Sequence, residues 1–142
     1  MVQLEYKGEK HIWLSCTEGL GNNTSYNEFE ENPASLKPGR IVFSKMKSLS
    51  DYGYENVRKL KCFNEASGLD GVFYYKDKGH NIRIPFFLHD VQGFSFVIMT
   101  HVFTKPTTNQ ENKEFKKAAK IKEEIINYLN KCSYGTLQKI IK

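Results

Sequence analysis

Apolar and polar residues alternate along five short segments of the chain, and this period of two predicts β-strands. Two of the segments, VQLEYK and HIWLSC, are separated by three residues and predict an N-terminal hairpin. The other three are joined by short turns and predict an antiparallel meander, with strands at residues 72–76, 82–88 and 95–105. Pro85 lacks the N–H that a strand ladder uses, so we expect a bulge or an edge-like position there.

A helical repeat predicts a pair of helices before the meander. Pro38 opens a segment whose apolar residues recur at helical spacing up to Gly53, a residue typical of helix ends. A second helix is expected at residues 54–63, which makes the pair a helical hairpin. The segment before Pro38 is rich in Gly, Asn, Ser and Pro and predicts a loop with one acidic helical turn at residues 26–32.

The clearest helical pattern follows the meander and predicts one continuous helix at residues 109–130. Thr108 and Glu111 have the spacing of a capping box. One apolar stripe runs along the helix, made by Phe115, Ala118, Ile125 and Leu129 and flanked by Ile121 and Tyr128. Much of the remaining surface is covered by lysines 113, 116, 117, 120 and 122.

Side chains alternate across a strand, so parity assigns the faces of the meander. On the middle strand, one face is the apolar series Ile82, Ile84, Phe86 and Leu88, and the other carries Asn81, Arg83, Phe87 and His89. On the last strand, His101, Phe103 and Lys105 share a parity with Val97 and Met99. We therefore expect Arg83, His101, Phe103 and Lys105 to line an open face of the sheet, with the helices packed on the opposite face.

Composition is that of one globular domain, and the charge is unevenly distributed. The 142 residues carry a net charge of +5. Residues 1–35 hold two lysines and six glutamates, whereas residues 36–142 hold 19 basic and 10 acidic residues. A basic body suits a polyanion such as RNA or DNA, or an acidic protein, and a solvated lysine-rich surface is the alternative.

Several classes of protein are disfavoured by the sequence. No apolar run approaches the ~20 residues that span a bilayer, and the N-terminus lacks the pattern of a secretory signal. The three cysteines are far apart and form no CxxC pair, which suggests neither a disulfide framework nor a zinc site. We expect a cytoplasmic protein that needs no metal or other cofactor.

The charged and aromatic residues of the meander are candidates for chemistry on a phosphate ester. A guanidinium and an ammonium suit a phosphate, an imidazole suits proton transfer near neutral pH, and an aromatic ring suits a stacked base. Arg83, His101, Phe103 and Lys105 supply these groups, with Lys76 at the end of the first strand. The alternative is structural, because a single His or Arg on a strand commonly serves as a hydrogen-bonding or ion-paired residue.

Four segments, VFYYK, IRIPFF, MTHVFTKPT and EFKKAAKIKEE, give the chain a resemblance to a known family. With the order of two helices, a meander and a charged helix, residues 36–130 resemble the RelE/ParE toxin superfamily, most of all its HigB-like, phage-type branch. The family's Leu-His-Gly-Phe-x-Lys-Lys-Thr segment is matched by His101, Phe103, Lys105 and Thr107. Matches elsewhere are Arg83 to the Arg of the middle strand, Lys76 to an Arg of the first strand, and Glu114 with Ala118 to a Glu-x-x-x-Ala pattern.

The resemblance implies an α+β, RelE-like fold: a helical hairpin packed on a small antiparallel β-sheet, with a C-terminal helix. Residues 1–142 would form a single domain, in which residues 1–35 are an acidic strand and loop extension. The family pattern is not complete. The departures are Tyr74 in place of Glu, Lys76 in place of Arg, Val102 in place of Gly and Pro106 in place of Lys.

The implied function is that of a type II toxin that blocks translation by cleaving mRNA on the ribosome. Such a metal-independent endoribonuclease needs its 2′-hydroxyl nucleophile aligned and the phosphate charge neutralised. Arg83 and Lys105 would hold the phosphate, and His101 would be a general acid or base. RNA would be bound by Lys76, Tyr75, Phe103, Lys113 and Lys117.

The implied partners are the ribosome, mRNA and a cognate antitoxin of the helix-turn-helix type, with no membrane involved. Two alternatives stay open. One is a ParE-like toxin, which binds DNA gyrase without cleaving RNA. The other is a non-catalytic, phage-type regulator of the same fold, which the departures from the family pattern favour.

Overall fold

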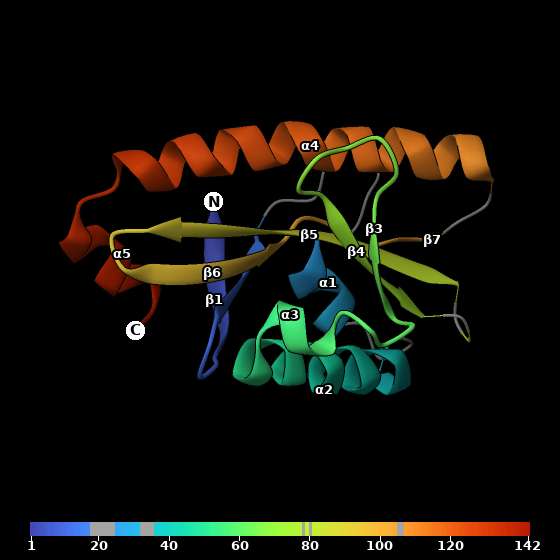
Figure 1. Ribbon diagram of the computed structural model, residues 1–142, viewed down its shortest axis with the longest axis horizontal. Helices are drawn as coiled ribbons and strands as arrows, with labels where there is room; N and C mark the ends of the chain where they lie inside the picture. Colours follow the sequence, from blue (N-terminus) through green and yellow to red (C-terminus); the bar gives the residue numbers. More distant parts are fainter. Residues whose placement is uncertain (18–24, 32–35, 78, 80, 105–106) are drawn as a thin grey trace.

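The computed structural model describes residues 1–17, 25–31, 36–77, 79, 81–104 and 107–142. These residues form an α+β fold in three layers, with a mixed sheet between one long helix and a group of three helices (Figure 1). None of the described helices has the length and apolar content that crossing a membrane requires. The elements are β1 (Val2–Lys7), β2 (Ile12–Cys16), α1 (Tyr26–Glu31), α2 (Leu36–Tyr52), α3 (Tyr54–Val57), β3 (Phe63–Glu65), β4 (Phe73–Asp77), β5 (Ile82–Val91), β6 (Phe94–Met99), β7 (Phe103–Thr104), α4 (Thr108–Lys131) and α5 (Tyr134–Ile140).

The N-terminal hairpin is confirmed, and it belongs to the main sheet. β1 pairs antiparallel with β2, and β2 pairs parallel with β6, giving the strand order β1-β2-β6-β5-β4-β3 with β7 beside β5. Parallel neighbours need a long crossover connection, which the chain between β2 and β6 supplies. The expectation of a purely antiparallel sheet was therefore wrong. The position of β2 inside the sheet is stabilised by burial, because Trp13 packs against the layer of α1 and α2 and Leu14 packs against the layer of α4, and both side chains are fully buried.

The first predicted helix is confirmed as α2, but the second ends early. Val42, Met46 and Leu49 of α2 are fully buried in the core between the sheet and α1–α3, which we call the α2-side core. Gly53 stops α2 in a left-handed conformation with φ of 90°. α3 then ends at Val57 instead of residue 63. The reason is that Phe63 is buried as part of β3, opposite Tyr75 of β4, and a strand competes successfully with the helical pattern there.

The meander of β4, β5 and β6 is antiparallel, as expected. The faces of β5 also follow the predicted parity. Ile82, Ile84, Phe86 and Leu88 pack in the α2-side core, whereas Arg83 and His89 bond to residues of α4 on the other face.

A β-bulge opposite Pro85 changes the parity of the last strand. Phe86 is paired with Met99, but Arg83 is paired with Phe103. The segment that joins β6 to β7 therefore contains one residue more between the two pairs than β5 does. Thr100 donates its N–H to the Pro85 carbonyl at 3.0 Å. As a result His101 lies on the same face as Phe96 and Ile98, not with Val97 and Met99 as predicted from an unbroken strand.

The face expected to be open is covered by α4. Its stripe of Phe115, Ala118, Ile121, Ile125 and Leu129 is buried against that face in what we call the α4-side core. The helix spans the length of the sheet (Figure 1). Its N-cap is Thr107, whose side-chain oxygen accepts from the Gln110 N–H at 3.2 Å, one residue before the predicted cap. Sequence parity placed Arg83 and His89 of β5 on this face correctly, but could not show that the same amphipathic helix would bury it.

Candidate functional site

Four of the predicted site residues lie on the face of the sheet that the N-terminal half of α4 covers. Arg83 of β5 is paired on one side with Phe103 of β7 and on the other with Lys76 of β4. The bulge brings His101 to this face as well. Lys105, the remaining predicted catalytic residue, lies outside the described residues. The sequence thus predicted the convergence of these residues, but the structure places them under a helix instead of at an open surface.

Arg83 is a buried ion-paired residue. Its side chain is only 6% exposed, and its Nε atom donates to the Oε2 atom of Glu111 on α4 at 3.1 Å. Its Nη1 atom donates to the Ile82 carbonyl at 3.2 Å. A guanidinium removed from water needs a charged or strongly accepting partner. Arg83 therefore fixes the first turn of α4 to the sheet.

His101 is fully buried and makes a hydrogen bond at each ring nitrogen. Its Nε2 atom lies 2.9 Å from the Glu114 Oε2 atom, and its Nδ1 atom lies 3.0 Å from the Thr100 hydroxyl. Burial lowers the pKa of His101 below its usual value, although Glu114 opposes this shift. We infer a neutral ring in which Nε2–H donates to Glu114, because a carboxylate can only accept. The Thr100 hydroxyl lies between the Nδ1 atom and the Pro85 carbonyl oxygen, which is 3.3 Å away.

Glu114 connects the buried histidine to the surface. Its Oε1 atom accepts from the Lys117 ammonium at 2.9 Å, one turn along α4. Burial alone would raise the pKa of Glu114, but the bonds from Lys117 and His101 outweigh it and hold the pKa below its usual value. The carboxylate is therefore charged near neutral pH and joins α4 to the bulge.

The aromatic residues predicted to stack on RNA bases are buried. Phe103 packs beside the His101 ring at 5.7 Å between centroids and meets Phe115 of α4 edge-on. Tyr75 is 1% exposed and lies in the α2-side core, in edge contact with Phe63. Neither ring has a free face in this arrangement, because each is occupied by core contacts. The assignment of Tyr75 and Phe103 as accessible stacking residues is corrected accordingly.

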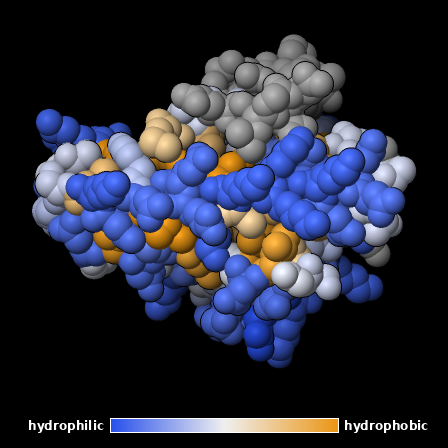
Figure 2. Space-filling model, turned by 90° about the horizontal axis from the view of Figure 1, so that it is seen from above, coloured by the Kyte–Doolittle hydropathy of each residue, from blue (hydrophilic) through white to orange (hydrophobic). Residues whose placement is uncertain are grey.

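The predicted RNA-binding lysines of α4 are exposed. Lys113 and Lys117 lie on the solvent side of the helix, and two further exposed lysines, Lys116 and Lys120, share that side. Glu114, the one acidic residue between 112 and 122, is turned toward His101. The outer side of this half of the helix therefore carries lysines and neutral polar residues, with Lys117 paired to Glu114, and hydrophilic residues follow the whole of α4 (Figure 2). We call Lys113, Lys116, Lys117 and Lys120 the lysine face.

Two acidic residues were missed as members of the site. Glu111 was interpreted as a helix-capping residue and Glu114 only as part of a family pattern, yet each bonds a buried basic side chain. Their spacing of three residues on one helix was a usable signal, since such residues share a face. Within the described part of the chain, no group of three or more His, Cys, Asp or Glu side chains is arranged to hold a metal ion.

Comparison with known proteins gives no relative: no family model, curated protein or solved structure matches this chain.

Proposed function

We propose that this chain is a translation-directed toxin of the RelE/ParE type that binds RNA through the lysine face of α4. The proposal is supported by the order of helix, antiparallel meander and basic helix, and by the motif around His101. Its partners would be the ribosome and mRNA, with a cognate antitoxin, of the helix-turn-helix type, that neutralises it. Four neighbouring ammonium groups suit the phosphates of a nucleic-acid backbone.

One observation carries the choice of binding over cleavage. Arg83 and His101 are buried and committed to Glu111 and Glu114 of α4. A substrate phosphate has no access to either group while α4 stays in place. These residues act instead as anchors that hold the lysine face rigidly against the sheet. The proposal shares the absence of cleavage with the non-catalytic, phage-type alternative but gives the chain a toxin's role in place of a regulator's.

Metal-independent mRNA cleavage is the second candidate, and the convergence of Lys76, Arg83 and His101 favours it. If α4 moved away from the sheet, a guanidinium could stabilise the phosphate and an imidazole could transfer the proton of the attacking 2′-hydroxyl. A gyrase-binding, ParE-like activity would use the fold without these groups.

Induced expression in bacteria tests the three functions together. Our proposal predicts that protein synthesis stops before DNA synthesis while mRNA remains intact, and that replacing the lysine face with glutamine relieves the arrest. New mRNA 5′ ends that disappear in a folded His101→Gln variant would establish cleavage instead. An early block of DNA synthesis with double-strand breaks would establish a ParE-like, gyrase-binding activity. Normal growth would exclude a toxin.

A further inference from the structure

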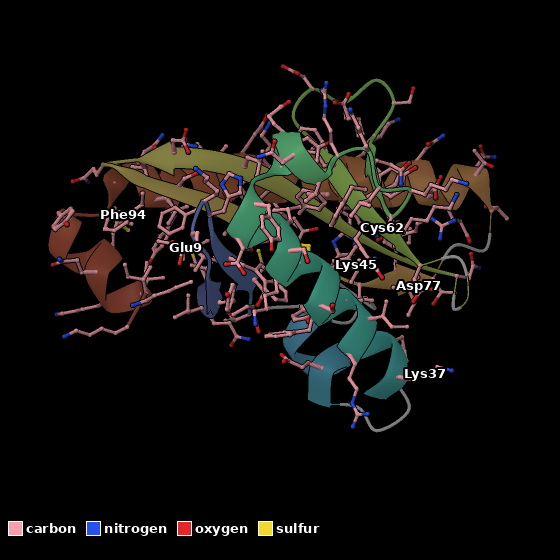
Figure 3. The ribbon with its side chains drawn as sticks, turned by 60° about the horizontal axis from the view of Figure 1, so that its bottom comes forward. Glu9, Lys37, Lys45, Cys62, Asp77 and Phe94 are labelled. Atoms are coloured by element: carbon pink, nitrogen blue, oxygen red, sulfur yellow. The ribbon has the colours of Figure 1, made fainter. Side chains whose placement is uncertain are left out.

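The end of the molecule beyond the C-terminus of α4 carries a ladder of three aromatic rings. Phe96 and Phe94 of β6 are stacked at 5.8 Å between centroids with 28° between their planes. Phe94 is stacked in turn on Tyr134 of α5 at 5.3 Å and 20°. Figure 3 shows Phe94 beside α5, and this end lies beyond the C-terminus of α4, whereas the lysine face lies toward the N-terminus of that helix (Figure 1).

The ladder runs from the core to the surface. Phe96 is fully buried in the α4-side core, whereas Tyr134 is 52% exposed. Since the Tyr134 ring is nearly parallel to that of Phe94, one of its faces is covered and the other is turned to solvent. The outermost ring therefore presents an open π-face backed by a fixed stack.

Hydrogen bonds hold this end of the molecule in place. Gln92, in the turn between β5 and β6, donates its side-chain N–H to the Cys132 carbonyl at 2.8 Å. Ser133 caps α5 by accepting from the Thr136 N–H at 3.1 Å. The turn before Phe94 is thus bonded to the end of α4 two residues before Tyr134, so the ring needs little further ordering when a ligand arrives.

The charge around the ladder favours an anionic partner. Residues 125–142 contain three lysines and no aspartate or glutamate, and Lys131, Lys139 and Lys142 are all exposed. The exposed carboxylate nearest in the strand register, Asp90, is opposite Ser95 and therefore on the other face of the sheet from Phe94. An aromatic platform beside ammonium groups is the combination that binds single-stranded nucleic acid.

We propose that Tyr134, backed by Phe94, is a stacking platform for one base of single-stranded RNA. The inference rests on the proposed function and adds to it a second contact of a different kind. The lysine face binds the phosphate backbone, and Tyr134 binds an unpaired base. About 16 Å separates Lys120, the residue of the lysine face nearest to this end, from Lys131 along the axis of α4, so the two contacts can be removed independently.

The test uses a fluorescently labelled single-stranded RNA of about ten nucleotides and the same strand with every base removed. Affinities are measured for the full chain and for Tyr134→Ala, Tyr134→Leu and Tyr134→Phe. Tyr52→Ala is the matched control, because Tyr52 is an exposed tyrosine on α2 that is 64% accessible. Thermal unfolding checks that each variant is folded.

We expect Tyr134→Ala and Tyr134→Leu to weaken binding of the base-containing strand about 5- to 100-fold, with Tyr134→Phe close to the unsubstituted protein. The abasic strand should bind all variants equally, and Tyr52→Ala should have no effect. Equal affinities of Tyr134→Ala and the unsubstituted protein for the base-containing strand would overturn the platform, as would an equal loss with the abasic strand.

Failure of the platform can be told apart from failure of the proposed function. If glutamine variants of the lysine face weaken RNA binding but Tyr134→Ala does not, the platform is wrong and the function stands. If Tyr134 binds the oligomer while the protein neither binds ribosomes nor inhibits cell-free translation, the function is wrong and the platform stands. A protein that binds neither strand contradicts both.

Discussion

Arg83 illustrates how residue type can be predicted from sequence while residue role is not. Parity placed it correctly on the face shared with His89, and an open face implied that its removal would hardly affect stability. Burial against Glu111 reverses that expectation. The sequence did not show which residue pairs with Arg83. An arginine that binds RNA and an arginine that anchors a helix have the same sequence pattern, and only the carboxylate opposite distinguishes them.

Arg83→Met should therefore lower the free energy of unfolding by about 3 kcal/mol, because it leaves Glu111 without its guanidinium in a mostly buried position. Glu111→Gln should also be destabilising, and the double variant should lose less than the sum by about 0.5–3 kcal/mol. Urea denaturation of the four proteins measures this coupling. Additive losses would show that the two side chains do not stabilise each other.

His101 should make stability depend on pH. Its pKa is lowered by burial from the usual 6.5, so above pH 6.5 both the folded and unfolded chains hold it neutral and stability is complete. As the pH falls from 6.5 toward the lower folded pKa, the unfolded chain takes up the proton first and the free energy of unfolding decreases. His11, also lowered mainly by burial, adds to this.

His101→Gln should remove part of that decrease and leave the part due to His11. Below pH 4.5 a further loss is expected from Glu114, whose pKa is lowered. Urea midpoints measured from about pH 4 to about pH 8.5 give the comparison, a range that extends at least about two units to either side of the ordinary histidine pKa. If the urea midpoint of His101→Gln fell as steeply below pH 6.5 as that of the unsubstituted protein, a buried neutral ring would be contradicted.

Among the elements, α4 was the most predictable and the end of the helical hairpin the least. The stripe of α4 runs from Phe115 to Leu129, about four turns, so tertiary contacts reinforce the local pattern. Residues 58–63 carry a weaker pattern that the burial of Phe63 overrides. The bulge at Thr100 could be anticipated from Pro85, but its effect on the faces could not, because a bulge can divert either of the paired strands.

The cap of α4 gives a test at this scale. Thr107→Ala should cost about 1 kcal/mol of stability, because the Gln110 N–H loses its side-chain acceptor. Thr108→Ala, one residue later and exposed, should be within about 0.5 kcal/mol of the unsubstituted protein. Thermal unfolding of the two matched variants decides between them. A larger loss of stability in Thr108→Ala than in Thr107→Ala would show that Thr108 is the N-cap, as the sequence predicted.

For the whole molecule, the sequence indicated the α+β class but not the arrangement of the layers. Alternation predicts that the N-terminal segments are strands, yet nothing local specifies that β2 joins β6 in parallel. The turn after β1 also docks on α2, where the Ser50 carbonyl accepts from the Lys10 and His11 N–H groups at 2.9 Å each. Residues 1–17 are therefore part of the core structure and not an extension.

Gly8→Ala tests this docking. A Cβ atom at Gly8 would collide with the backbone and side chain of Ser50, so we expect a loss of roughly 1–3 kcal/mol. Gly39→Ala in α2 is the control, since its Cβ would meet only Phe29 at an ordinary 3.9 Å. It should leave stability unchanged or raise it by up to about 1 kcal/mol. Equal stability of both variants would show that the hairpin is not docked on α2.

The central claim is that the lysine face of α4 binds RNA, and the salt dependence of ribosome binding tests it most directly. The comparison is between Lys113, Lys116 and Lys120 changed together to glutamine and an equal change on the α2 side, at Lys37, Lys59 and Lys61, of which Figure 3 labels Lys37. Loss of three phosphate contacts should reduce the slope of log affinity against log salt by about 2–3, whereas the control slope should match that of the unsubstituted protein. Identical slopes for the two triple variants would contradict the account.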